Sequence, residues 1–215
     1  MLADIARQYS GGRLLFIGTT NIDLQRPVLW NIGAVAASGH PRALHLVRQI
    51  LLASAAIPGA FPPVLIGVES RGRRYSEMHV DGGAIAQAFL YPHSLELARE
   101  ANQRGIVRER NAYLIRNDRF DPDWATTERS FLSIAQRSIR AMIHYSGVND
   151  AIRIYATTRR DGVPFHLAYI GTDFQFPPHK EFDQAYMLAL FDYAFQKARN
   201  NYPWKASLAG VFGGR

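Results

Sequence analysis

Apolar side chains recur at helical spacing in two long stretches of the C-terminal half. Residues 181–200 carry the clearest stripe, which predicts a helix with its aromatic side in the core. A second stripe predicts a long amphipathic helix that starts near Thr126 and reaches the 150s, with a break or kink at Gly147. The first stripe comprises Phe182, Ala185, Tyr186, Ala189, Leu190, Tyr193 and Ala194, and the second comprises Phe131, Ile134, Ala135, Ile139, Met142 and Tyr145.

The N-terminal half alternates between short helical and strand patterns. Residues 2–9 predict a helix ended by two glycines, and the apolar run 13–18 predicts a central strand buried on both faces, as parallel strands usually are. Thr19, Thr20 and Asn21 are expected to leave the sheet, and residues 28–32 to form another strand. Gly39-His40-Pro41 opens a further helix, which Pro58 should end because a proline disfavours helical backbone before it.

The stretch 54–83 organises the rest of the chain. It predicts a helix end, a proline-rich turn, a hairpin-like excursion and a strand at 75–80 that delivers Asp81 into a turn of Gly82 and Gly83. Further on, we expect a helix at 94–104, strands at 111–117 and 163–170, and a poorly ordered tail at 201–215. The alternation indicates an α/β fold, a three-layer sandwich, with residues 1–215 as a single domain.

Composition removes several kinds of chemistry. The 215 residues include no cysteine, which excludes disulfides, zinc–thiolate sites and a cysteine nucleophile. The seven histidines form no H-x-x-x-H pair, so we expect no metal site, and without a glycine-rich dinucleotide or phosphate motif we expect no cofactor. No serine lies in a G-x-S-x-G elbow. The sequence shows neither a signal peptide nor an apolar run of about 20 residues, and it leaves the compartment open.

The net charge of +7 suits a nucleic acid, an anionic lipid surface or an ordinary solvated basic face. The densest basic group, Arg71, Arg73 and Arg74, lies in the expected hairpin without any aromatic platform, so a solvated face is favoured and no nucleic-acid partner is expected. A non-catalytic module for a lipid or membrane surface is the alternative function, suggested by this charge together with Phe61 and Trp204.

Two residues have both a chemical and a structural interpretation. Asp81 ends a strand, where open α/β sheets tend to place their chemistry, but an aspartate before two glycines is also a common turn or capping residue. Ser54 could be a nucleophile, yet no glycine flanks it at either second neighbour, so we interpret it as a helix-end residue bonded to its own backbone.

An ordered set of four phrases resembles the patatin-like phospholipases of bacterial type. They are the runs 15–21 (LFIGTTN), 30–36 (WNIGAVA), 53–63 (ASAAIPGAFPP) and 80–83 (VDGG). The pattern around Tyr186 to Tyr193, followed by Tyr202-Pro203-Trp204, is similar to the end of those proteins. The resemblance therefore extends along nearly the whole chain.

The resemblance implies a lipid acyl hydrolase with a Ser–Asp dyad and no catalytic histidine. By correspondence Asp81, in the motif Asp81-Gly82-Gly83, is the carboxylate that orients the serine hydroxyl and accepts its proton. The implied partner is a lipid or another acyl-ester substrate, with an anionic membrane surface as a further expectation.

The sequence departs from that family in lacking the elbow serine and the glycine-rich oxyanion loop. We therefore expect a C-terminal portion of a patatin-like fold, incomplete at its N-terminus and inactive alone. Loss of neighbouring strands would expose apolar surface, so the isolated chain is expected to be marginally stable and to associate.

Overall fold

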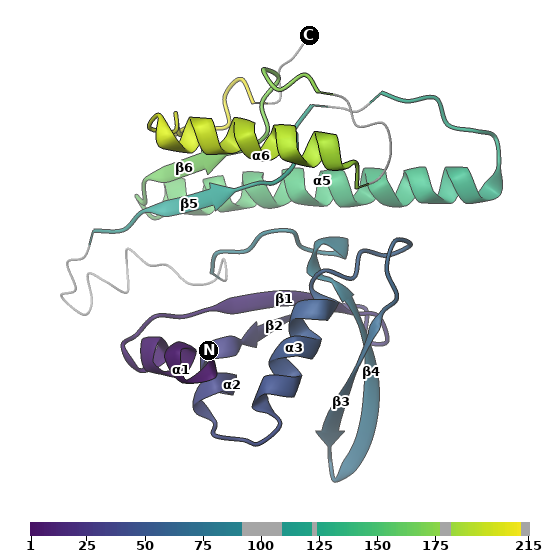
Figure 1. Cartoon of the computed structure of the whole chain (residues 1–215), viewed down its shortest axis with the longest axis vertical. Helices are drawn as coiled ribbons and strands as arrows, with labels where there is room; N and C mark the ends of the chain where they lie inside the picture. The colour runs from purple at the N-terminus through teal and green to yellow at the C-terminus, as the bar shows by residue number, and fades with distance from the viewer. Residues whose placement is uncertain (92–108, 122–123, 177–181, 212–215) are drawn as a thin grey trace. The chain divides into compact units, whose positions relative to one another are not determined.

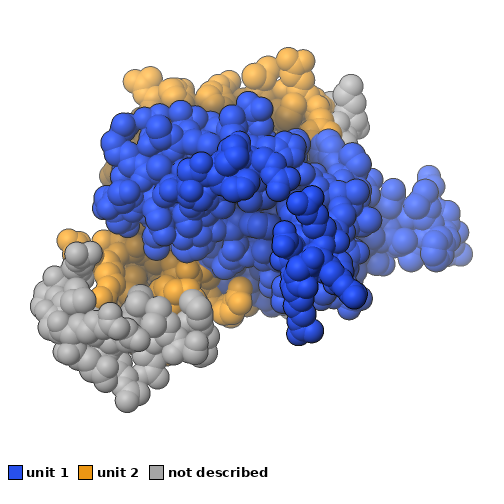
Figure 2. Space-filling model, turned by 90° about the horizontal axis from the view of Figure 1, so that it is seen from below, with its two compact units in different colours: residues 1–89, 127–150 blue, residues 90–126, 151–215 orange. Residues whose placement is uncertain are grey.

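The computed structural model describes residues 1–91, 109–121, 124–176 and 182–211. It mixes helices and strands, with one sheet of four strands and one of two, and so confirms the α/β class (Figure 1). The chain divides into two compact units (Figure 2). Unit 1 contains residues 1–89 and 127–150, and unit 2 contains residues 90–126 and 151–215. The single domain expected over residues 1–215 stays a prediction.

The sheet of unit 1 is antiparallel throughout, in the order β2-β1-β4-β3. Its strands are β1 Phe16–Asn21, β2 Arg26–Asn31, β3 Val64–Ser70 and β4 Arg73–Asp81. β2 follows β1 through residues 22–25 alone, too short a connection for a parallel crossover, so it folds back beside β1. β3 and β4 form the expected hairpin, whose turn has positive φ at both Arg71 and Gly72.

β1 is an inner strand, as expected, but its partners and its burial differ from the prediction. Leu14 and Leu15 precede the strand and are exposed, as is Phe16, so the expectation of an apolar run buried on both faces was wrong. The buried part of β1 is the polar part, Thr19, Thr20 and Asn21, which we had expected to leave the sheet. These side chains tolerate burial because they are hydrogen-bonded, as described below.

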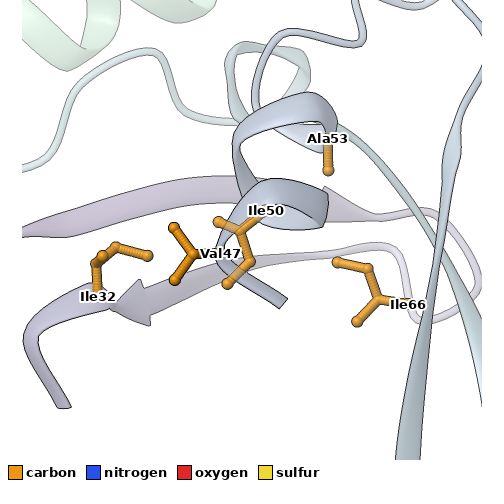
Figure 3. Packing of buried hydrophobic residues seen from close by; sticks show 5 residues of the cluster. All are labelled: Ile32, Val47, Ile50, Ala53 and Ile66. Atoms are coloured by element: carbon orange, nitrogen blue, oxygen red, sulfur yellow. The ribbon is translucent and has the colours of Figure 1, made fainter. Parts of the chain in front are cut away.

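Helices α1 Leu2–Ser10, α2 Ile32–Ala37 and α3 Ala43–Ala53 lie over one face of this sheet (Figure 1). The core between α2, α3 and β3 contains Ile32, Val47, Ile50, Ala53 and Ile66 (Figure 3). Each large side chain buried here contributes about 1.5–3 kcal/mol relative to exposure. The predicted helices at 2–9 and after Pro41 are thereby confirmed, and they anchor the sheet that carries the candidate site.

Unit 2 contains a parallel pair of strands and a C-terminal helix. β5 Ala112–Ile115 pairs with β6 Phe165–Ala168, and α6 Gln184–Arg199 follows. Lys205 forms a β-bridge with Leu167, so the part of the tail that the structure describes is tied to β6. The expected helix at 94–104 and the residues after 211 lie outside the described residues.

Helix α5 Phe131–Arg160 runs for 30 residues without interruption and contributes to both units (Figure 1). The expected break at Gly147 was wrong. A glycine within a helix costs only about 1 kcal/mol relative to alanine, which tertiary packing easily offsets, and Gly147 is buried.

The two apolar stripes are less buried than the sequence indicates. In α6, Tyr186, Ala189, Leu190 and Tyr193 are half-buried and no residue is fully buried. Phe182 is exposed because Asp183, which accepts hydrogen bonds from the backbone N–H groups of Ala185 and Tyr186, starts the helix after it. In α5, the predicted apolar stripe lies largely in solvent.

Candidate functional site: the Asp81 turn

Asp81 is the last residue of β4 and caps the short 3-10 helix η1 Gly82–Ala84. Its Oδ1 accepts a hydrogen bond from the Gly83 backbone N–H at 2.7 Å, and its own backbone N–H donates to the Ala56 carbonyl at 3.0 Å. The second bond joins the end of β4 to the turn that follows α3. The backbone of Asp81 and one of its carboxylate oxygens are therefore fixed, and within the described residues no hydrogen bond engages Oδ2.

Burial makes the Asp81 carboxyl easier to protonate than a carboxyl on the surface. Its side chain is half-buried, and desolvation raises the pKa of Asp81 above its ordinary value, while the Gly83 N–H acts in the opposite direction. A carboxylate with a raised pKa is a stronger proton acceptor than one on the surface, which is a useful property for a general base.

Gly82 is required by the close approach of two backbones. A Cβ atom at this position would lie 2.8 Å from both the carbonyl carbon and the oxygen of Gly18 in β1. The Gly82 carbonyl is in turn approached by the Thr20 hydroxyl at 3.4 Å. The turn after Asp81 is thus pressed against the middle of the sheet, and the position of the carboxylate follows from that contact.

A buried polar network lies beside Asp81, around β1, β2 and β4. The Trp30 Nε1–H donates to Thr19 Oγ1 at 2.8 Å, and Thr19 Oγ1 lies 3.0 Å from His79 Nδ1. His79 Nε2 lies 3.4 Å from a Glu77 carboxylate oxygen, which also accepts from the Asn21 amide at 2.8 Å. Since the carboxylate can only accept, the hydrogen bonds are satisfied together when His79 carries its proton on Nε2 and Thr19 donates to Nδ1.

Sequence reasoning missed this network, although one signal was present. Glu77, His79 and Asp81 alternate along β4 and therefore share one face of the strand. Thr19 pairs with Asp81 and Asn21 pairs with His79, so the register places polar residues of β1 beside them. His79 is fully buried, and the network therefore restrains the strand that presents Asp81.

The segment after the turn is held by the middle of α5. Asp150 accepts hydrogen bonds from the backbone N–H groups of Gln87 and Ala88 at 2.7 and 3.1 Å. The Gln87 side chain donates to the Ile143 carbonyl, and the Ser146 hydroxyl donates to the Ile85 carbonyl. These bonds, all within unit 1, fix the chain on the far side of the Asp-Gly-Gly turn.

The other candidate, Ser54, is structural. It caps α3, and its hydroxyl donates to the Leu51 carbonyl at 2.9 Å, as the structural interpretation predicts. No serine in the described ranges hydrogen-bonds Asp81. No group of three or more potential ligands is placed to hold a metal among the residues described.

None of the described helices has both the length and the apolar character needed to cross a membrane. No protein-family model matches the chain, and no curated protein matches it significantly.

Proposed function

We propose that this chain supplies the carboxylate of a Ser–Asp acyl hydrolase of the patatin-like phospholipase type. The observation that carries the proposal is the state of Asp81, half-buried at a strand end, with a raised pKa and one oxygen fixed by Gly83. The resemblance of the four phrases to that family supports it, as does the contact between Gly82 and β1. The family's three-layer sandwich belongs to the same proposal.

In this mechanism Asp81 accepts the proton of a serine hydroxyl as the serine attacks an ester carbonyl. The bond from Gly83 to Oδ1 orients the carboxylate, and Oδ2 is the oxygen proposed to take the proton. Asp81 then passes this proton to the oxygen of the departing alcohol as the acyl–oxygen bond breaks, so the acyl-enzyme forms with Asp81 ionised again. Asp81 accepts a proton from the water that attacks the acyl-enzyme and returns it to the serine oxygen as the carboxylic acid leaves. The serine must come from a G-x-S-x-G segment that this sequence does not contain, as must the oxyanion donors.

The test uses the native protein with any segment that carries the serine, and a soluble ester such as 4-nitrophenyl butyrate. Asp81→Asn preserves a carbonyl oxygen for Gly83 but removes the base, so kcat should fall by about 10²–10⁴-fold. Asp192→Asn, on the exposed side of α6, is the matched control and should leave kcat unchanged. An Asp81→Asn protein that folds normally and retains kcat would refute the proposal.

The alternative, a non-catalytic module for a lipid or membrane surface, is favoured by a separate observation. Phe61 and Trp204 are exposed, as expected, but the larger exposed apolar surface lies on α5. That surface does not depend on Asp81.

A further inference from the structure

Strands β5 and β6 of unit 2 form a parallel pair with one open edge. The backbone N–H groups of Ala112 and Arg116 donate to carbonyls in and just before β6, at 2.9 and 2.8 Å. Alternate residues of a strand bond to opposite sides, so the backbone N–H and C=O groups of Tyr113 and Ile115 point away from β6. Within the described residues no hydrogen bond engages these outward backbone groups.

The other sheet edges among the described strands are each protected in part. β2 carries Pro27, which has no N–H to offer a neighbouring strand. At β3 the Gln49 side chain donates to the Leu65 carbonyl at 2.9 Å, and the outer side of β6 is bridged by Lys205. β5 has no proline, charged residue or such bond over residues 112–115. A strand edge without protection of this kind readily accepts another strand.

The open edge of β5 is complementary to itself. In an antiparallel pair of two copies centred on Leu114, Tyr113 of each copy lies opposite Ile115 of the other. Both residues have outward backbone groups, so the pair on each side of the two-fold axis exchanges two hydrogen bonds. All the outward groups of both copies are then satisfied, in an interface that uses the same surface twice.

The side chains agree with this register. Tyr113 is 59% exposed and Ile115 73%, and the two lie on the same face of β5 because alternate residues share a face. Across the two-fold axis each aromatic ring lies beside a β-branched side chain, which is a favourable cross-strand pair. Pairing therefore removes both exposed apolar side chains of each copy from water.

The charges that flank β5 also match in this register. Arg110 and Asp118 lie four positions on either side of the axis, so the arginine of one copy comes opposite the aspartate of the other. Glu109 and Arg119, five positions on either side, give a second match of opposite sign. The Asp118 side chain is 47% exposed, and a carboxylate can accept several donors beside those it already has. Exposed pairs of this kind add little affinity, but they favour one partner and one register.

We propose that β5 is a dimerisation edge, through which two copies of the chain join their unit 2 sheets about a two-fold axis at Leu114. The joined sheet has the strand order β6-β5-β5-β6, with parallel outer pairs and an antiparallel centre. The interface lies within unit 2 and does not depend on Asp81 or on ester hydrolysis. One pair of short strands is a small interface, so the dimer is weak and reversible.

Single-cysteine variants of the 215-residue chain test the register, because the chain has no cysteine of its own. In the proposed dimer Leu114 lies opposite its own counterpart, at a Cα separation of about 4.5 Å that a disulfide can span. Tyr113 and Ile115 lie diagonally from their own counterparts, about 7–8 Å apart and beyond that reach. On mild oxidation Leu114→Cys should form covalent dimers at least about tenfold faster than Tyr113→Cys or Ile115→Cys.

Sedimentation velocity over a concentration series measures the dimer without cross-linking. Ile115→Lys places a charge in the strand pair and changes a side chain that is already largely exposed, so the fold should be retained. It should raise the dimer dissociation constant by about tenfold or more. Leu188→Lys on α6, 58% exposed, is the matched control and should leave the dissociation constant unchanged.

Three outcomes would overturn the proposal. The first is a chain that stays monomeric at every concentration, and the second is an equal rate of cross-linking at the three cysteine positions. The third is a dimer that Ile115→Lys leaves intact and Met142→Ser dissociates, which would place the interface on α5.

Discussion

Replacing Thr19 by valine tests whether the buried network beside Asp81 stabilises unit 1. Valine retains the shape and the β-branched backbone preference of threonine and removes only the hydroxyl. That hydroxyl accepts from Trp30 Nε1 and partners His79 Nδ1, so the substitution leaves two polar atoms without a partner.

The expected cost follows from the burial of those atoms. His79 is fully buried, and an unsatisfied buried acceptor costs about 1–3 kcal/mol. Trp30 is half-buried, so water can partly replace its lost bond and its cost lies at the lower end of that range. We expect the free energy of unfolding of unit 1 to fall by about 2–4 kcal/mol in total.

Thr20→Val is a matched control in the next position of the same strand. Thr20 is also buried, but its hydroxyl approaches the Gly82 carbonyl only at 3.4 Å. That carbonyl accepts backbone N–H groups of Ile85 and Ala86 as well, so it keeps its partners when the hydroxyl is removed. Thr20→Val should therefore cost less than about 1 kcal/mol.

Urea unfolding followed by the fluorescence of Trp30 measures the difference. Trp124 and Trp204 belong to unit 2, so replacing both with phenylalanine leaves one reporter, in unit 1. The urea midpoint should fall clearly for Thr19→Val and little for Thr20→Val. The slope of the unfolding free energy against urea concentration should be the same in both variants. Equal shifts for the two variants would refute the reasoning, because they would show that the network contributes nothing beyond packing.

Three further predictions concern turns and an ion pair. Gly82→Ala should lower the free energy of unfolding of unit 1 by about 2 kcal/mol or more, because its Cβ would overlap the Gly18 backbone. A urea midpoint that is unchanged within experimental error would show that the turn can shift. Arg71→Asn should raise the thermal midpoint, by about 0.5–1 kcal/mol in stability, because asparagine tolerates positive φ better; no rise would refute this. Lys197 lowers the pKa of Asp173, and Asp173 and Tyr193 raise the pKa of Lys197 against the effect of desolvation. The pair therefore stabilises unit 2 at pH values between the pKa of Asp173 and the pKa of Lys197. The stabilisation is at most about 1 kcal/mol, because the pair is largely exposed, and Asp173→Asn should remove it. In the unchanged protein it is lost as pH falls through the folded pKa of Asp173 or rises through the folded pKa of Lys197. Urea midpoints that fall equally for both proteins across pH 2–5 would contradict it.

The local features of the fold could be predicted because their signals are local. The turn residues around Arg71 and the alternation beside it predict the β3–β4 hairpin, and two glycines after Asp81 predict the turn that ends β4. Ser54 bonds its own helix, as serine at a helix end often does. Each of these depends on residues a few positions apart.

The predictions that failed concern features that depend on residues far apart in the sequence. A continuous apolar run before Thr19 indicates a strand but not the direction of its neighbours, and the short connection to β2 decided that direction. Helical spacing in α5 shows that one side of the helix is apolar but not which side packs against the protein. In the structure the side that carries Arg137 and His144 is less exposed than the apolar side. The buried network joins Thr19 to His79 across 60 positions, a distance no periodicity can report.

The division of unit 1 into two chain segments has a consequence for how the protein is made. The Asp150 carboxylate that holds Gln87 is 63 residues further along the chain, so at about 5–20 residues per second it leaves the ribosome about 3–13 s later. Residues 1–89 can assemble their sheet during that interval, but Gln87 and Ala88 gain their hydrogen bonds to Asp150 only when α5 arrives. A nascent chain halted between these two points should therefore remain open to protease beyond Ala86 while β1–β4 are already resistant.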